Sequence, residues 1–238
     1  MDFAVNYHNW IMEEFAPFVG KEVAEVGAGT GSFSELILDF GVKDLSLFEP
    51  SENMFPLLKK KFLDNRQKRI NFPSLSPPSG DLGGVVEINN CYFENRENAK
   101  DKKFDSLFYI NVLEHIKNDF AELSIAFDAI KKGGHILIFV PALSWLFSDL
   151  DRSVGHFRRY NKIELETLVK KAGFEIVKSK YFDSFGVIPW YFLFVLLKRE
   201  MGQGGVSFYD KFVIPIEKTI EKKIPIPFGK NLLLVGRR

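Results

Sequence analysis

The sequence has little cysteine, and its histidines are scattered along the chain. Cys91 is the one cysteine among 238 residues, which excludes an internal disulfide and a cysteine-based zinc cluster and fits a reducing, cytoplasmic setting. The four histidines are too far apart in the sequence for a local metal-binding motif; they are His8, His115, His135 and His156. The sequence therefore predicts no metal site.

A strong excess of charge of one sign is also lacking. Lysine and arginine total 32 and aspartate and glutamate total 31, which gives a formal charge of +1. Because binding to phosphate backbones needs an excess of basic side chains, no nucleic acid partner is expected. Residues 1–120 hold 13 basic and 19 acidic side chains, and residues 121–238 hold 19 and 12. An acidic first half suits a cationic ligand and a basic second half an anionic acceptor, although two ordinary solvated faces give the same counts.

No apolar run is long enough for a membrane-spanning helix. The two longest uncharged runs, residues 133–148 and 184–197, are each interrupted by a proline, and both fall short of the roughly 20 apolar residues that a spanning helix needs. The first twenty residues lack a basic start followed by an apolar stretch, so no secretion signal is expected. With 46% hydrophobic residues, the chain is predicted to form a single domain over residues 1–238.

Apolar blocks of strand length alternate with helical patterns, which is typical of a mostly parallel sheet covered by helices on both faces. The predicted fold is a doubly wound α/β domain with an opening helix over residues 6–18. Seven strands are expected, over residues 21–26, 45–48, 85–93, 104–110, 135–140, 174–182 and 231–236. Helices are expected from residue 51 to about 62, over 112–130 and over 161–173, and residues 184–229 are predicted to form a helical cap between the last two strands.

A glycine-rich turn follows the first strand, where an open α/β sheet binds a nucleotide-like ligand. Its glycines are Gly27, Gly29 and Gly31. A dinucleotide-binding fingerprint would place the third glycine one position later, at Ser32, which argues against a nicotinamide cofactor. Glu25 precedes the turn, and a carboxylate there suits a ligand with sulfonium and ammonium groups, such as S-adenosylmethionine.

Glu49 ends the second strand, eighteen residues after Gly31. A carboxylate in that position can accept hydrogen bonds from both hydroxyls of a ribose. This also occurs in nicotinamide enzymes, so Glu49 supports an adenosine ligand without distinguishing the two cofactors.

Five segments together resemble the class I S-adenosylmethionine-dependent methyltransferases, the family that includes the ubiquinone and menaquinone pathway methylases. The segments are YHNW, AEVGAGTGSFS, LFEPSENM, FDSLFYINVLEHI and GGHILIFVPAL. The resemblance implies S-adenosylmethionine as cofactor, with the three glycines below its methionine part, Glu49 at the ribose and Met54 near the adenine. It further implies cofactor contacts from Pro50, Asn111, Val112, Leu113 and His115. For the acidic adenine contact that the family usually has after the third strand, Asn89, Asn90 and Glu94 stay open.

Residues 111–115 also have a purely structural interpretation. In that interpretation they are a strand end running into a helix, with Leu113 and Ile116 packed inside and Glu114 solvated. The glycine turn favours a functional role, because the carboxyl ends of parallel strands meet at one crevice.

His156 is the candidate catalytic residue. It lies in the sequence DRSVGHFRRY, after the fifth strand, and its unperturbed pKa of about 6.5 suits a general base. The alternative is that Arg159 and Tyr160 merely anchor the next helix, whose capping box begins at Asn161.

The predicted function is S-adenosylmethionine-dependent methyl transfer to a small-molecule or a lipid- or glycan-linked acceptor. The alternatives are a nicotinamide-dependent oxidoreductase and a non-catalytic module that binds the cofactor. Residues 184–197 carry aromatic side chains next to Lys198 and Arg199, a composition that suits peripheral contact with a membrane. An ordinary cap helix buried on the sheet explains the same segment.

Overall fold

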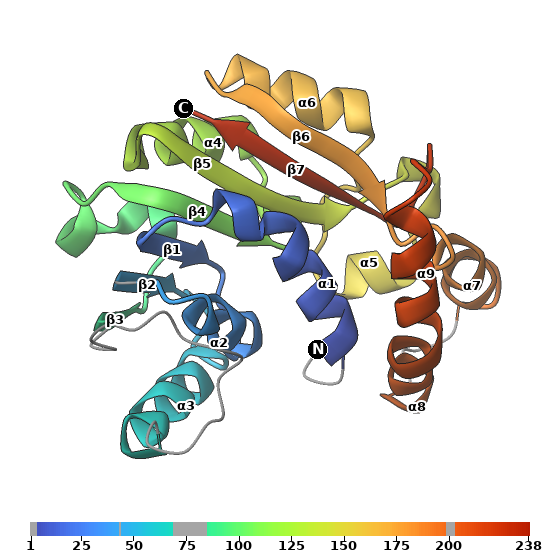
Figure 1. The fold of residues 1–238 in the computed structure, drawn as a ribbon, viewed down its shortest axis with the longest axis horizontal. Coiled ribbons are helices and arrows are strands. Elements are labelled where there is room, and N and C mark those ends of the chain that lie inside the picture. The colour runs from blue at the N-terminus through green and yellow to red at the C-terminus, as the bar shows by residue number, and fades with distance from the viewer. Residues whose placement is uncertain (1–3, 43, 69–84, 199–202) are drawn as a thin grey trace.

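The computed structural model describes residues 4–42, 44–68, 85–198 and 203–238. A seven-stranded sheet runs through its centre in the order β3-β2-β1-β4-β5-β7-β6 (Figure 1). The strands are β1 (Glu22–Val26), β2 (Asp44–Phe48), β3 (Val85–Asn89), β4 (Phe104–Ile110), β5 (Ile130–Pro141), β6 (Glu175–Phe182) and β7 (Asn231–Arg237). Only β7 is antiparallel to its neighbours, β5 and β6. The predicted seven-stranded, mostly parallel, doubly wound sheet is confirmed.

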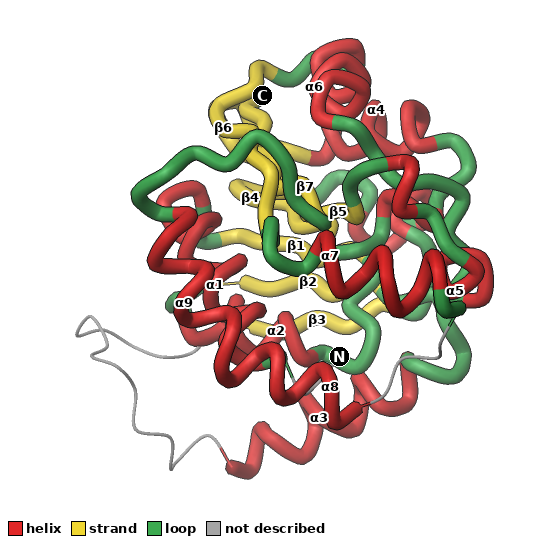
Figure 2. The backbone as a smooth tube through the Cα atoms, turned by 90° about the vertical axis from the view of Figure 1, so that its right-hand side faces the viewer, coloured by secondary structure: helices red, strands yellow, loops and turns green. Residues whose placement is uncertain are grey.

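Helices cover both faces of the sheet (Figure 2). The helices of the main body are α1 (Val5–Phe15), α2 (Ser32–Asp39), α3 (Phe55–Lys68), α4 (Asp119–Ala129), α5 (Asp149–Ser153) and α6 (Lys162–Lys171). On one face, the sheet packs against Trp10 of α1 and Ile37 of α2. On the other face, Leu123 of α4 and Val169 of α6 close a second core. The strands are therefore buried on both sides, which explains their continuous apolar sequences.

Between β6 and β7 the chain is helical. This part comprises α7 (Val187–Trp190), the π-helical η6 (Tyr191–Leu196), α8 (Gln203–Phe208), the π-helical η7 (Tyr209–Val213) and α9 (Ile214–Glu221). These helices, called the cap below, gather with α5 at the end of the sheet where β5 ends (Figure 1). Across the described ranges, no helix combines the length and apolar character that crossing a membrane requires.

Several predicted boundaries differ from the structure. The helix expected over residues 112–130 is instead a single 3-10 turn (Leu113–His115) followed by α4, which begins at Asp119. Asn118 caps α4 by accepting a hydrogen bond from the amide of Ala121, 3.2 Å away. Pro56 is the second residue of α3, where a missing amide proton costs nothing. Residues 73–84 and Arg199 lie outside the described residues.

The crevice for a ligand lies where the strand order reverses. From β1 the chain passes outward to β2 and β3 and then returns to β4 on the other side of β1. The carboxyl ends of β1 and β4 are neighbours in register, with Val26 opposite Tyr109. The glycine turn and residues 111–115 follow these two strand ends directly, so they meet at this reversal point.

Candidate functional site

The glycine turn leaves open space at only one of its three glycines. All three have positive φ, namely +68° at Gly27, +57° at Gly29 and +81° at Gly31. A Cβ on Gly27 would lie 2.5 Å from Val112, and one on Gly31 would lie 2.7 Å from Phe62. A Cβ on Gly29 would meet nothing within 4 Å. Gly27 and Gly31 therefore allow close packing, whereas Gly29 borders space that a ligand can occupy.

Glu49 is bound to the same turn. One carboxylate oxygen accepts a hydrogen bond from the amide of Gly29 at 2.7 Å, and the other accepts from the amide of Ser51 at 2.8 Å. The residue is only 6% exposed. Each oxygen keeps a further lone pair for a hydroxyl donor. This geometry suits the ribose role predicted for Glu49, with the two amides orienting the carboxylate beside the open space at Gly29.

Glu25 lies inside the protein below the turn. It is 2% exposed, and its carboxylate accepts a hydrogen bond from the hydroxyl of Ser34 in α2. Burial, reinforced by the nearby charge of Glu49, raises the pKa of Glu25 to about 8. Near neutral pH the carboxyl is therefore largely protonated, and a cation placed beside it would favour its ionised form.

The remaining residues predicted to bind the cofactor come from two strand ends. Asn111 has a φ of +52°, and its amide donates to the carbonyl oxygen of Phe139 at 2.8 Å. Val112 packs on the glycine turn, and Leu113 is buried. After β2, Pro50 is half-buried and Met54 is 43% exposed.

A cavity of about 260 Å³ lies at the end of β3; its lining includes Asn89, Asn90 and Arg96. The side-chain amide of Asn90 donates to the carbonyl oxygen of Glu49 at 2.9 Å, which connects the cavity to the ribose-binding candidate. Glu94, the acidic candidate for the adenine contact, lies in the 3-10 turn Phe93–Asn95 and does not line the cavity.

His156 is held in a fixed orientation by Asp151. The imidazole Nδ1 lies 2.9 Å from the Asp151 carboxylate, and the amide of His156 donates to the carbonyl oxygen of Asp151 at 2.9 Å. Arg159 is 4% exposed; its Nε donates to the same carboxylate at 2.9 Å, and its Nη2 forms an ion pair with it at 2.9 Å. Although burial alone would raise it, these hydrogen bonds lower the pKa of Asp151 to about 2. An ionised Asp151 accepts a hydrogen bond from a protonated Nδ1, so the unprotonated ring nitrogen of a neutral His156 is Nε2.

Glu114 faces the free nitrogen of His156. It is fully buried, and neither carboxylate oxygen has a hydrogen-bond partner in another described residue. Burial raises the pKa of Glu114 to about 8. Its Oε1 lies 3.8 Å from His156 Nε2. The interpretation of Glu114 as a solvated helix residue is therefore wrong, because the chain turns inward at the 3-10 turn instead of entering a helix.

His115 completes the cluster around Glu114. Its ring centre lies 4.6 Å from that of His156 at an interplanar angle of 78°. Burial and the neighbouring His156 lower the pKa of His115. The four histidines lie too far apart in the sequence for a local metal-binding motif, yet one potential ligand atom from each of Glu114, His115 and His156 lies within 4.8 Å of the others.

The sequence HFRRY binds the His156 loop to the segment that carries Glu114. The hydroxyl of Tyr160 donates to the carbonyl oxygen of Leu113 at 3.2 Å and to Asp119 at 2.9 Å. Arg158 pairs with Asp119 and donates to the carbonyl oxygen of Lys117 at 2.8 Å. The motif therefore does more than precede the helix α6. It also fixes the His156 loop to the start of α4.

Comparison with known proteins identifies the family. The family model of a methyltransferase domain matches residues 7–179. A structure of an S-adenosylmethionine-dependent methyltransferase from Archaeoglobus fulgidus superposes with a TM-score of 0.61 at 21% identity, covering 100% of this chain and 95% of that one. A putative methyltransferase from Bacillus halodurans gives 0.60 at 18% identity, covering 97% of each chain. The chain belongs to the methyltransferase domain family and is an S-adenosylmethionine-dependent enzyme.

Curated relatives are similar over a shorter stretch. A tRNA U34 carboxymethyltransferase from Helicobacter acinonychis is 31% identical over 123 residues, which is 50% of this chain and 39% of that protein. The enzyme of the same name from Helicobacter pylori strain Shi470 is 28% identical over 133 residues, with 54% and 43% covered. The chain thus spans about two fifths of the length of these relatives.

The residues at the glycine turn fit the cofactor that the family uses. The open space at Gly29 and the oriented carboxylate of Glu49 match an adenosine ligand, and the buried Glu25 can take up charge beside a cation.

Proposed function

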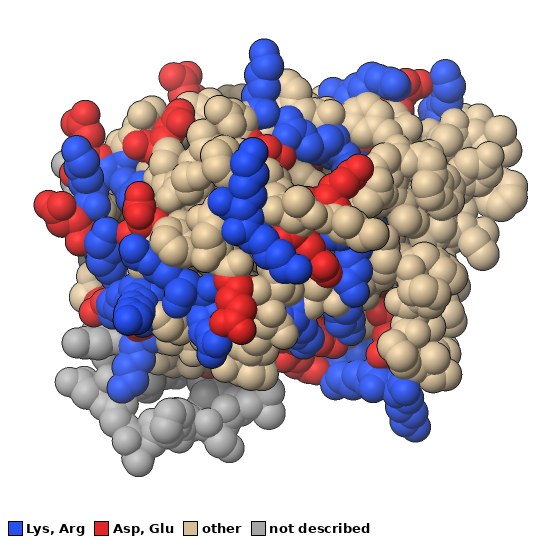
Figure 3. All heavy atoms as spheres, turned by 90° about the horizontal axis from the view of Figure 1, so that it is seen from above, with Lys and Arg blue, Asp and Glu red and all other residues tan. Residues whose placement is uncertain are grey.

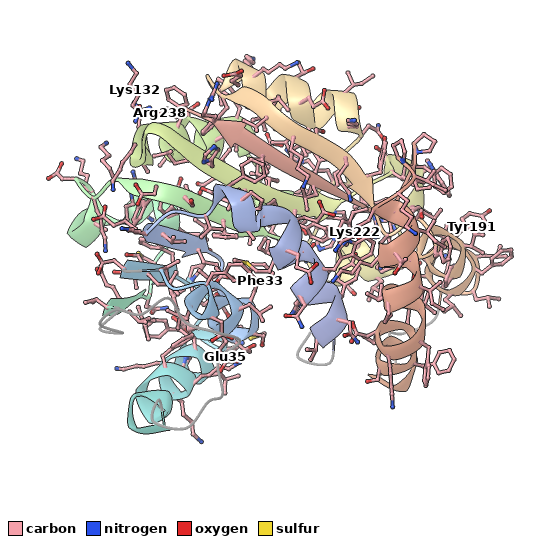
Figure 4. The ribbon with its side chains drawn as sticks, in the orientation of Figure 1. Phe33, Glu35, Lys132, Tyr191, Lys222 and Arg238 are labelled. Carbon is pink, nitrogen blue, oxygen red and sulfur yellow. The ribbon has the colours of Figure 1, made fainter. Side chains whose placement is uncertain are left out.

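We propose that this enzyme methylates an apolar acceptor, lipid-linked or otherwise presented at a membrane surface. The observation that carries this proposal is the exposed apolar surface of the cap. Ile188, Phe192 and Leu196 project from α7 and η6, and Phe208 and Phe212 from α8 and η7, each more than half exposed. Tyr191 points away from the body of the protein (Figure 4). Monomeric soluble proteins rarely expose so many large apolar side chains together.

The cap contacts the loop that holds His156. Trp190 of α7 donates from its indole nitrogen to the carbonyl oxygen of Leu146 at 3.2 Å. The guanidinium of Arg159, which binds Asp151, lies 4.4 Å from the centre of the Trp190 ring. Trp145 and Tyr191 bring their ring centres to 5.9 Å. An acceptor that enters along the cap is therefore delivered next to the His156 loop.

Cationic side chains flank the apolar surface. Lys211 lies 5.4 Å from the ring of Phe212, and Lys198, whose side chain is 69% exposed, follows η6 and pairs with Asp149 at 3.2 Å. Seen from above, the cap end of the molecule shows mostly uncharged residues, with basic groups at its margin (Figure 3). Aromatic side chains with adjacent lysines suit an anionic membrane interface.

His156 acts as the general base in the proposed reaction. S-adenosylmethionine supplies an electrophilic methyl group, and an acceptor oxygen or nitrogen attacks it in line with the leaving sulfur. His156 Nε2 takes the acceptor's proton, while Asp151 stabilises the resulting imidazolium through Nδ1. Glu49 and the glycine turn hold the cofactor, and alignment of the two reactants supplies a large part of the rate.

A second candidate acceptor is tRNA, because the curated relatives are tRNA U34 carboxymethyltransferases. The chain lacks the basic excess that a phosphate backbone attracts, since its formal charge is +1. The similarity to tRNA-modifying enzymes therefore weakens the prediction that the protein has no nucleic acid partner. It does not identify an RNA-binding surface on this chain.

Both candidates can be tested in one labelling experiment. The enzyme is incubated with methyl-labelled S-adenosylmethionine and a cell extract containing membranes and tRNA, and the products are separated into organic, aqueous small-molecule and nucleic acid fractions. We expect label in the organic fraction, abolished in Gly29→Val. Label in tRNA, or only in water-soluble small molecules, would refute the membrane-presented acceptor.

A further inference from the structure

We propose that Glu114, His115 and His156 bind a divalent transition-metal ion at the acceptor side of the site. This inference rests on the proposed function in one respect, because the role given to the ion is to bind the acceptor. The three residues converge from the 3-10 turn after β4 and from the loop after α5. Two imidazoles and one carboxylate are the donor set of many open zinc sites.

The distances suit an ion after small side-chain movements. Neighbouring donor atoms of a tetrahedral ion with bonds of about 2.0 Å lie roughly 3.3 Å apart. Glu114 Oε1 and His156 Nε2 are 3.8 Å apart, and one donor atom from each of the three residues lies within 4.8 Å of the other two. Rotation about side-chain torsions can supply the remaining contraction of each distance.

Glu114 provides an independent indication of a ligand. A buried carboxylate normally has hydrogen-bond partners, because leaving it without them costs several kcal/mol. Glu114 is 0% exposed, and both of its oxygens lack a partner in the other described residues. A bound cation would satisfy these oxygens.

The surroundings resemble the outer shell of a metal site. A metal-binding histidine usually donates its second ring nitrogen to a carboxylate or a carbonyl group, which fixes the nitrogen that faces the metal. His156 Nδ1 is bound to Asp151 in this way at 2.9 Å, and His115 is hydrogen-bonded to the backbone of Gly155. Both histidines therefore have one ring nitrogen occupied.

Three protein ligands leave at least one coordination position for the acceptor. A hydroxyl bound there would lose its proton to solvent water more readily, because the ion would stabilise the oxyanion. The oxyanion would then form a bond to the methyl carbon while the bond from that carbon to the sulfonium sulfur breaks, leaving neutral S-adenosylhomocysteine. Because His156 Nε2 would bind the ion, the ion would replace the imidazole as the group that makes the hydroxyl reactive. The acceptor class is thereby an ionisable hydroxyl, such as a phenol or an enol.

The test measures metal binding without any acceptor. Untagged full-length enzyme is treated with a chelator, dialysed and titrated with Zn²⁺ by calorimetry and with Co²⁺ by visible absorption. We expect one site per chain with a dissociation constant in the micromolar range or tighter, and a Co²⁺ spectrum of low-coordinate type. Glu114→Gln and His156→Asn should each weaken binding at least tenfold, whereas the control His135→Asn, at the opposite end of the sheet, should not.

Absence of a stoichiometric site, or equal affinity in Glu114→Gln and wild type, would overturn the metal proposal. Both variants are compared with wild type by S-adenosylhomocysteine affinity, so that loss of fold is recognised separately. If the metal binds but no organic-phase product forms, the proposed acceptor fails while the metal site stands. If product forms at an unchanged rate in chelator-treated enzyme, the ion has no part in the reaction.

Discussion

Phe192→Glu is predicted to weaken binding of the enzyme to anionic vesicles without affecting its fold. Phe192 is 52% exposed, so the protein itself buries only about half of the ring. Full burial of a phenylalanine side chain is worth about 1.5–3 kcal/mol, and the exposed half can therefore contribute roughly 1 kcal/mol at a membrane. A glutamate also adds repulsion of about 1 kcal/mol from an anionic surface. The expected total of about 2 kcal/mol corresponds to roughly a thirtyfold loss of affinity.

The assay is flotation with vesicles of mixed phosphatidylcholine and phosphatidylserine at low and physiological salt. Wild-type binding should decrease as salt is added, because the lysines around the apolar surface are screened. Phe40→Glu is the matched control, since Phe40 is 47% exposed and follows α2, away from the cap. Its vesicle binding should equal that of wild type.

Equal loss in Phe192→Glu and Phe40→Glu would show that added negative charge alone reduces binding, and it would refute the cap as the docking surface. The same conclusion follows if wild-type enzyme fails to float at low salt. Thermal unfolding of both variants should match wild type within a few degrees, because exposed positions contribute little to stability.

Three further predictions concern the site itself. Gly29→Val and Gly41→Val each place a branched residue at a positive φ, +57° and +72°, with open space around it. Both variants should therefore lose about 1–2 kcal/mol of stability, but only Gly29→Val should abolish S-adenosylhomocysteine binding in calorimetry. Similar affinities in the two variants would exclude Gly29 from the site. Because the pKa of Glu25 is raised to about 8, binding of the cationic S-adenosylmethionine at pH 7 should release protons, whereas binding of neutral S-adenosylhomocysteine should release fewer. Calorimetric titrations in buffers of different ionisation enthalpy measure the number of protons released. Equal proton release with the two ligands would refute the role of Glu25 beside the cation. In the free enzyme the same shift makes the contribution of Glu25 to stability greatest below pH 4.5, falling as the pH rises through 8. His156→Asn should lower turnover about a hundredfold with unchanged S-adenosylhomocysteine affinity, and a turnover near wild type would remove His156 from the chemistry.

The sequence was sufficient to predict the number of strands and where most of them lie in the chain, because each strand is a short apolar run between turn residues; the third strand, expected over residues 85–93, ends earlier, at Asn89. Residues 104–110 and 231–236 were predicted with little or no error, and α6 has the expected capping box at Asn161. The glycine turn could be predicted equally well, since strand, turn and helix are contiguous in the chain. What these features share is that local sequence determines them.

The region around residue 114 could not be predicted in the same way. Its apolar residues at helical spacing favoured one helix over residues 112–130. The structure instead has a 3-10 turn there, because distant groups bind its backbone: the amide of Phe157 donates to the carbonyl oxygen of Glu114 at 2.9 Å, and Tyr160 donates to that of Leu113. These hydrogen bonds come from more than forty residues away in the chain and compete with helical ones.

The same long-range contacts account for the missed cluster of Glu114, His115 and His156. Helical residues 113, 114 and 115 would project in different directions, and an exposed helix would leave Glu114 in solvent. By ending the helix early, the contacts from Phe157 and Tyr160 turn the Glu114 side chain inward and bring it to 3.8 Å from His156. The motif HFRRY thus acts on the site from both sides, since it carries His156 and also holds the backbone that presents Glu114. Tyr160→Phe removes the hydrogen bonds to Leu113 and Asp119 but leaves the side chains of Glu114, His115 and His156 in place. The substitution should therefore disturb the position of Glu114 more than it disturbs the glycine turn.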